Sequence, residues 1–200
     1  MFLDEDTKTK VSNVLKDINK KIKIKSIIEE NDIGKELISL MEEIKEMNEN
    51  ISFEYEINNN NSFLPYTEVF VDDISTRCSF SGVPGGKEIN SFVACLYHIG
   101  YKELDFDKKL KERIIKINKI LNIQICVSLS CHHCAQCVST MQQFALWNKN
   151  ISAQMIDANL YPKLIEQYKI ERVPLVLVNG DIIIKGAKEN DVLVRYLEEV

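Results

Sequence analysis

The residues of this chain that are best suited to chemistry are the two cysteines of a Cys-His-His-Cys run at positions 131–134. Two thiols at this spacing can form a disulfide and open it again. The run follows an apolar, strand-like segment, residues 123–129, and we expect a helix over residues 131–147. Unpaired N–H groups at a helix N-terminus favour the thiolate, which is the form that attacks a disulfide. The pattern therefore predicts thiol–disulfide exchange, in which Cys131 attacks and Cys134 resolves the mixed disulfide.

Two histidines lie between these cysteines and are candidates for tuning them. An imidazole beside a thiolate can lower the pKa of the thiol through its charge or a hydrogen bond. A lower pKa also makes Cys131 a better leaving group and the disulfide more oxidising. For His132 and His133 separately, the alternative is a side chain that only faces the solvent.

The other cysteines suggest a metal site or buried thiols. The chain has six cysteines, and four of them fall within twelve residues, at 126, 131, 134 and 137. That crowding argues against a framework of structural disulfides. The spacing C-x-x-C-x-x-C occurs in ferredoxins, and the histidines add zinc as an option. However, the segment has a helical pattern and lacks a distant fourth cysteine at a ferredoxin-like offset. We therefore expect no metal, with Cys137 in the core; a non-enzymatic Cys/His metal-binding module remains an alternative.

Length and composition exclude several other classes of protein. Two hundred residues allow one large domain or two small ones, and the net charge is −5 with lysines and glutamates interleaved. This argues against a nucleic-acid surface. The apolar runs are too short to span a membrane, and the acidic N-terminus does not resemble a signal segment. We expect a cytoplasmic protein without nucleic-acid or membrane partners.

The elements that must position the cysteines fall into two similar halves. In each half the hydrophobic periodicity predicts a helix, a strand, a helix, a strand, a β-hairpin and a final helix. The second half adds a helix over residues 160–168, where the first half has a loop with four asparagines at 58–61. This order predicts an α/β protein with two tandem thioredoxin-like folds, residues 1–102 and 103–200. The halves share the order of elements rather than obvious residue identity.

The periodicities and turn residues predict four details of these halves. We expect a helix stripe that runs on to Leu121, a short strand at 77–80, and a last helix capped by Asn190 or Asp191. The Val173–Pro174 bond opens the third strand of the second half. In thioredoxin folds this proline is usually cis and lies against the active-site cysteines, so we expect the same of Pro174. The alternative is a trans proline at a strand start.

The first half lacks the thiols of the second. The position after its first strand reads Glu29-Glu30-Asn31-Asp32, so we expect the first fold to be redox-inactive. Glu88, near the start of a helix in this half, has two open roles. It could stabilise that helix N-terminus, or it could reach the active site as a proton acceptor or a modulator of the thiol pKa.

The active-site segment also carries a family resemblance. The run Ser-Leu-Ser-Cys-His-His-Cys at 128–134 resembles the N-terminal domain of the alkyl hydroperoxide reductase flavoprotein component. The similarity continues at residues 172–180 and 81–88, and covers nearly the whole chain. It implies two tandem thioredoxin folds, the first without a redox centre. It also implies that Cys131 and Cys134 take electrons from a flavin-dependent disulfide reductase and pass them to a peroxiredoxin. In the family an acidic residue of the first fold lies near the redox centre, and Glu88 matches it.

The chain departs from this family in two respects. His133 stands where the family has an asparagine, which adds an ionisable group between the two cysteines. No G-x-G-x-x-G follows any predicted strand, so we expect no cofactor in this chain, with FAD and NAD(P)H on a partner or a further domain. A general protein disulfide oxidoreductase of the glutaredoxin-like tandem type remains a second enzymatic alternative. Such proteins usually keep a C-x-x-C in each half.

Overall fold

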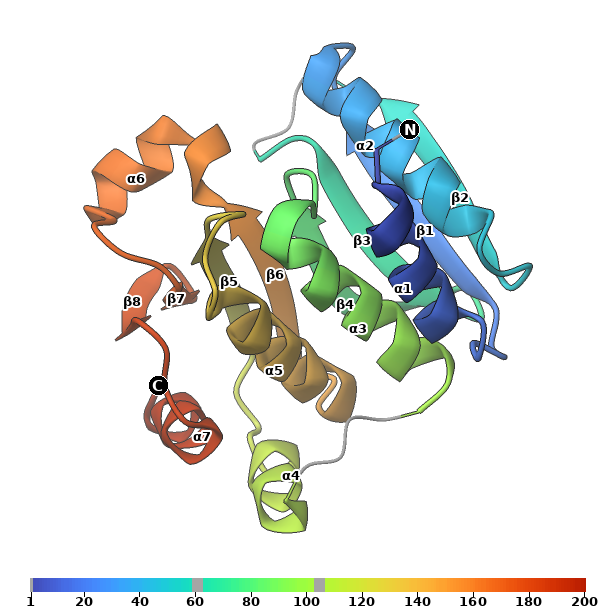
Figure 1. Cartoon of the computed structure of the whole chain (residues 1–200). Coiled ribbons are helices and arrows are strands. Elements are labelled where there is room, and N and C mark those ends of the chain that lie inside the picture. Colours follow the sequence, from blue (N-terminus) through green and yellow to red (C-terminus); the bar gives the residue numbers. More distant parts are fainter. Residues whose placement is uncertain (1, 59–62, 103–106) are drawn as a thin grey trace.

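The computed structural model describes residues 2–58, 63–102 and 107–200 (Figure 1). Within these residues the strands are β1 (Ile22–Ile28), β2 (Ile51–Ile57), β3 (Tyr66–Val71), β4 (Ile74–Ser81), β5 (Leu121–Val127), β6 (Ile151–Asp157), β7 (Leu175–Val178) and β8 (Asp181–Lys185). The α-helices are α1 (Glu5–Leu15), α2 (Asp32–Lys45), α3 (Ile89–Gly100), α4 (Lys108–Ile115), α5 (Cys134–Trp147), α6 (Pro162–Tyr168) and α7 (Asn190–Glu199). Two short 3₁₀ helices, η1 (Gly86–Glu88) and η2 (Ala158–Leu160), complete the described elements.

All eight strands join one sheet that repeats its topology. The order is β2-β1-β3-β4-β6-β5-β7-β8, so strands one to four and five to eight have the same arrangement. In each half the first pair is parallel and the next two pairs are antiparallel. A parallel β4–β6 pairing, from Cys78–Ala153 to Ser81–Ile156, joins the halves. This confirms two tandem thioredoxin-like folds.

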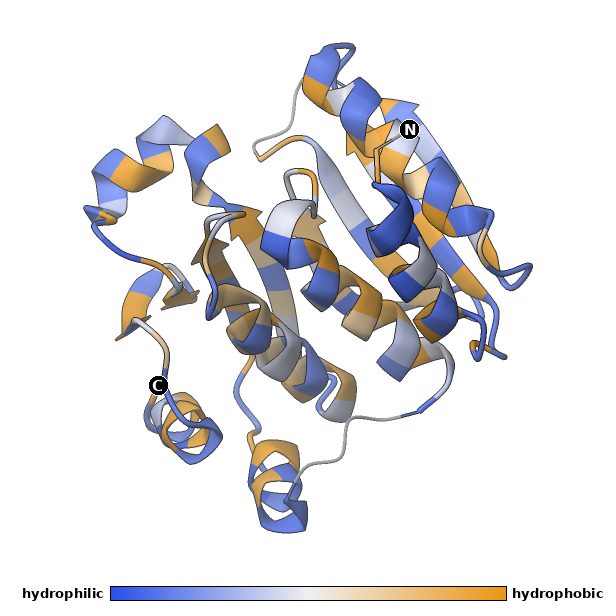
Figure 2. Ribbon diagram, in the orientation of Figure 1, coloured by the Kyte–Doolittle hydropathy of each residue, from blue (hydrophilic) through white to orange (hydrophobic). Residues whose placement is uncertain are grey.

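The main core lies on one face of the sheet and contains residues from both halves. Buried Ile22, Ile24 and Ile28 alternate with partly exposed residues along β1, as expected for a strand with one covered face. Helices α3 and α5 run side by side over this face, one from each half (Figure 1). Hydrophobic residues cover much of α3, whereas α2, α6 and α7 alternate hydrophobic and hydrophilic residues (Figure 2).

The opposite face differs between the halves. On β5 and β7, the residues that alternate with the main core form a second apolar cluster with α6, which includes Cys126, Leu164, Leu175 and Leu177. The corresponding face of the first half carries charged, half-buried or exposed side chains, which include Lys25, Glu54 and Glu68. The asparagine loop predicted there falls largely on residues 59–62, outside the described residues. The proposed boundary at 102/103 borders residues 103–106, also outside them, so it stays a prediction.

Three expected boundaries are wrong. Leu121 does not end a helix: α4 stops at Ile115, and Leu121 opens β5 as a buried residue whose N–H donates to the Asn150 carbonyl. The strand expected at 77–80 is longer, because its antiparallel pairing with β3 begins at Ile74. Neither Asn190 nor Asp191 caps α7, which has Glu189 at its N-cap.

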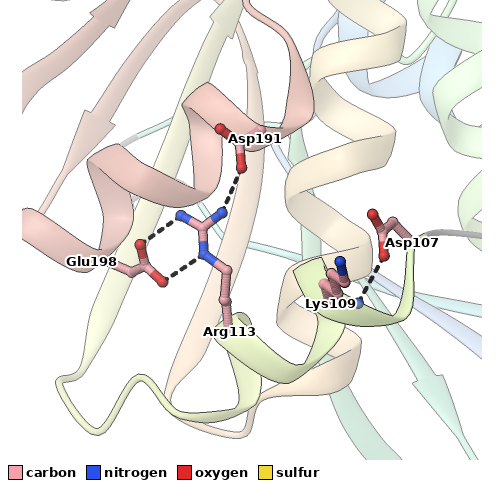
Figure 3. A network of polar contacts seen from close by, with 5 residues as sticks. All are labelled: Asp107, Lys109, Arg113, Asp191 and Glu198. Atoms are coloured by element: carbon pink, nitrogen blue, oxygen red, sulfur yellow. Dashed lines mark hydrogen bonds and ion pairs between the residues drawn. The ribbon is translucent and has the colours of Figure 1, made fainter.

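The carboxylate of Asp191 is instead bound to Arg113 of α4. Arg113 also forms a two-pronged ion pair with Glu198, near the other end of α7 (Figure 3). This arginine therefore fixes α4 and α7 together through both ends of α7. None of the helices within the described residues is long and apolar enough to cross a membrane.

Candidate active site

Cys131 and Cys134 form a disulfide between the end of β5 and the start of α5. Their Cα atoms are 5.6 Å apart, a usual separation for a disulfide. The side chain of Cys134 is fully buried, whereas Cys131 is partly exposed. Only Cys131 therefore presents a sulfur to an incoming partner, which is the arrangement that an attacking and a resolving cysteine require.

The expected helix start at Cys131 is wrong by three residues. The Cys131 N–H donates to the Ser128 carbonyl, 2.9 Å away, so this residue lies in a turn. His133 takes the N-cap position and Cys134 is the first helical residue. The unpaired N–H groups of α5 consequently begin at the buried cysteine, and Cys131 lies just outside the positive end of the helix dipole.

The peptide bond before Pro174 has the predicted cis form, and its carbonyl is close to Cys131. The Val173–Pro174 bond is cis. The Cys131 Sγ atom is 3.9 Å from the Val173 carbonyl oxygen. This carbonyl, two residues before β7, forms one wall of the site, and the strand begins at Leu175 rather than at Val173 as expected.

Both histidines between the cysteines are exposed to solvent. His133 also lines a hollow of about 640 Å³ that Gln136, Cys137 and Thr140 border on the α5 side, with residues 187–190 and the start of α7 opposite. Exposure leaves both imidazoles free to meet a partner. Their tuning of the thiols stays a prediction.

Glu88 is fully buried at the junction of the two folds. Its carboxylate accepts a hydrogen bond from Ser91, while its Oε1 atom is buried without a hydrogen-bond partner. Burial raises the pKa of Glu88 to about 7, and repulsion from Asp157 adds to the rise. The first fold thus places an ionisable carboxyl group next to elements of the second fold.

The electrostatic neighbours of Glu88 include the third cysteine of the cluster. Burial raises the pKa of Cys137 to about 12, with a smaller contribution from Glu88. Cys137 lies in the core, as predicted, with 6% of its surface exposed. Cys137, which Glu88 influences, is one helical turn from Cys134. A role of Glu88 in tuning Cys131 or Cys134 stays a prediction.

The remaining thiols are buried. Burial raises the pKa of Cys126 to about 12. A hydrogen bond with Cys78 and burial raise the pKa of Cys95. Within the described ranges, no three His, Cys, Asp or Glu side chains form a group that could hold a metal ion. We therefore expect the buried thiols outside the disulfide to be unreactive.

Comparisons with known proteins agree with this geometry. A family model described as "Thioredoxin domain" matches residues 121–198, the half that carries the disulfide. The chain is 30% identical over 182 residues to a protein named NADH dehydrogenase from Bacillus subtilis, which covers 90% of this chain and 35% of that protein. It is 24% identical over 185 residues to the alkyl hydroperoxide reductase protein AhpF from Pseudomonas aeruginosa, over 92% of this chain and 35% of that protein.

A solved structure of AhpF from Enterococcus faecalis superimposes with a TM-score of 0.92 and 26% identity, over 98% of this chain and 100% of that chain. The chain resembles the N-terminal domain of AhpF. It spans about a third of the length of the curated relatives it matches. A protein disulfide oxidoreductase from Aeropyrum pernix, at 15% identity and a TM-score of 0.84, shares the fold.

The first fold of this AhpF-like domain keeps the scaffold of the site without its thiols. Asn31 occupies the turn before α2, and its side-chain oxygen accepts a 2.8 Å hydrogen bond from the Gly34 N–H. This capping pair has the same three-residue spacing as Cys131 and Cys134. A Cβ atom on Gly34 would lie 2.2 Å from the Glu29 carbonyl oxygen, so a cysteine does not fit there without a shift of the backbone. Leu64–Pro65 is cis, like Val173–Pro174.

A repeated asparagine motif further relates the two folds. Residues 48–52 and 148–152 both read Asn-x-Asn-Ile-Ser, one hundred positions apart. Asn48 donates to the Leu15 and Ile18 carbonyls, and Asn148 donates to those of Ile114 and Ile117. The expectation that the halves lack obvious residue identity is therefore wrong. A search for this motif would have aligned the halves from sequence alone.

Proposed function

We propose that this chain is a thiol–disulfide oxidoreductase that relays electrons from a flavin-dependent disulfide reductase to a peroxiredoxin-type acceptor. One observation carries the proposal: a disulfide whose outer sulfur, on Cys131, is accessible beside Pro174 while its inner sulfur is buried. The resemblance to AhpF supports the choice of partners.

The exchange proceeds in two steps from the reduced form. The Cys131 thiolate attacks a disulfide of the acceptor, a mixed disulfide forms, and the first acceptor sulfur leaves as a thiolate that takes up a proton. The Cys134 thiol loses its proton and attacks the Cys131 sulfur, and the second acceptor sulfur leaves. The acceptor gains two electrons and two protons, and the chain is left with the Cys131–Cys134 disulfide. A dithiol of the reductase reverses both steps.

The residues around the disulfide support this role. The Val173 carbonyl, just before β7, lies 3.9 Å from the Cys131 sulfur, and the turn from Ser128 places Cys131 near Cys134. The chain's own residues thus bind and orient the two sulfurs, while FAD and NAD(P)H supply hydride chemistry on a partner or a further domain. Four buried cysteines outside the disulfide fit a reducing, cytoplasmic compartment.

The test is NADH-driven reduction of an oxidised peroxiredoxin through a flavin-dependent disulfide reductase. We expect Cys131→Ser to lower turnover by more than about a hundredfold, because it removes the nucleophile. Cys126→Ser is the matched control, since this buried cysteine lies outside the site. Normal turnover by Cys131→Ser would contradict the proposal.

The second enzymatic candidate is a general protein disulfide oxidoreductase. A comparison of insulin with peroxiredoxin as the acceptor separates the two. Equal or faster reduction of insulin would favour the general enzyme, and a clear preference for peroxiredoxin would favour the relay.

A further inference from the structure

The segment 83–88 of the first fold contacts the active-site turn of the second fold. The Lys87 N–H donates a 2.8 Å hydrogen bond to the Leu129 carbonyl, two residues before Cys131. Gly86 lies against the same carbonyl: a Cβ atom there would be 2.6 Å from the Leu129 oxygen. Any movement of this segment therefore reaches the turn that carries Cys131.

Residues 2–4, which precede α1 and are called the N-terminal arm below, also contact this segment. The ring of Phe2 packs on Gly85, where a Cβ atom would lie 2.9 Å from the Phe2 Cζ atom. The Phe2 ring is half-buried against the main core. Because glycine has no side chain, the aromatic ring contacts the backbone of Gly85 directly and restricts its movement.

A carboxylate anchors the arm itself. The Phe2 and Leu3 N–H groups both donate to the side chain of Glu43 on α2. Leu3 is buried, and Glu43 has only 9% of its surface exposed. Charge-assisted hydrogen bonds of this kind are stronger than neutral ones, so the arm has a fixed position.

We propose that Phe2 is a positioning residue for the redox disulfide, acting through Gly85 and Leu129 on Cys131. This rests on the proposed function, because it assigns Phe2 a role in thiol–disulfide exchange. The packed path from Phe2 keeps the active-site turn where Cys131 meets Cys134. Without the ring, the turn samples more positions, the effective concentration of one thiol at the other falls, and the dithiol form is favoured.

The test is the equilibrium between dithiol and disulfide in glutathione or dithiothreitol buffers that bracket the midpoint of the wild-type chain. The oxidised fraction is measured by alkylation of free thiols and mass spectrometry. We expect Phe2→Ala to lower the equilibrium constant for disulfide formation by about threefold or more, and Phe2→Tyr to restore most of it. Phe53→Ala is the matched control, since Phe53 is also half-buried against the main core but lies on β2.

Equal equilibrium constants for wild type and Phe2→Ala would overturn the role of Phe2, as would an equal change in Phe53→Ala. Because this equilibrium involves no peroxiredoxin, it is read separately from the proposed relay. If Phe2→Ala unfolds, Glu43→Gln tests the same path by weakening the anchor of the arm, and an unchanged constant in that variant would also overturn the proposal.

Discussion

The Lys87 N–H donates a 2.8 Å hydrogen bond to the Leu129 carbonyl. This bond connects the first fold, which lacks a C-x-x-C, to the turn that carries Cys131. The neighbouring residue, Gly86, approaches the same carbonyl closely. Gly86 has a φ of +52°, and its Cα faces the Leu129 oxygen closely enough to exclude a side chain.

Gly86→Ala is expected to disturb this junction. The new Cβ atom would lie 2.6 Å from the Leu129 oxygen, so the backbone must shift in addition to the cost of the positive φ. We expect a loss of about 2–3 kcal/mol in urea unfolding and slower exchange at Cys131. Gly186→Ala is the matched control: its φ is +77°, but nothing lies within 4 Å of a Cβ atom there. Equal losses for the two variants would contradict the close contact.

Glu88 should make the stability of the protein depend on pH. Burial raises the pKa of Glu88 from its ordinary value of 4.5 to about 7. Between these values the folded chain keeps a proton that the unfolded chain has released, so stability falls as the pH rises from 4.5 to 7 and then levels off. Glu88→Gln should remove this fall and add up to about 3 kcal/mol above a pH of about 7.

Urea unfolding of the oxidised protein at a series of pH values measures the effect of Glu88. The exposed Glu199→Gln serves as the control and should leave the pH profile as it is. If stability depends on pH in the same way in Glu88→Gln and in the wild type, the pKa of Glu88 is not raised in the folded protein, which would contradict this prediction.

Cys137 should have no part in exchange, although it is one turn from Cys134. Burial and the charge of Glu88 raise the pKa of Cys137 to about 12, so the thiol stays protonated at neutral pH. Cys137→Ala should keep turnover within about twofold of wild type and lower stability by about 1 kcal/mol, the cost of a small cavity. A tenfold loss of turnover would instead assign a redox role to this third thiol.

The repeated asparagines should carry much of the local stability of each fold. Asn148 has 6% of its surface exposed and donates two 2.8 Å hydrogen bonds to the carbonyls of Ile114 and Ile117. Asn148→Ala leaves both carbonyls without this donor, for an expected loss of about 2–3 kcal/mol in urea unfolding. Asn48→Ala should cost less, about 1 kcal/mol, because Asn48 is more exposed. Equal losses would contradict the difference in burial.

Local patterns in the sequence were sufficient for the order of elements and for the redox pair. The strand and helix periodicities and the C-x-x-C spacing each depend on residues that are close in the chain, whereas the cis form of the Val173–Pro174 bond was expected from the thioredoxin-like order of elements. The start of α5 was misplaced because Cys131 satisfies its N–H in a turn with Ser128, which helical periodicity does not report.

Contacts between the halves could not be predicted in the same way. The β4–β6 pairing and the Lys87–Leu129 bond join residues that are far apart in sequence. Such contacts follow from how the two folds meet, and Gly85 and Gly86 were visible only as a turn. The silent first site was predicted from the missing thiols, but its Asn31–Gly34 cap required the structure.

The central claim is that Cys131 attacks and Cys134 resolves. The most direct measurement is to mix the reduced Cys134→Ser variant with an oxidised peroxiredoxin and to map the trapped species by mass spectrometry without reduction. We expect one stable mixed disulfide, with the partner bound through Cys131, because the resolving thiol is absent. A mixed disulfide through any other cysteine of this chain, or none under conditions in which the wild type reduces the acceptor, would contradict it.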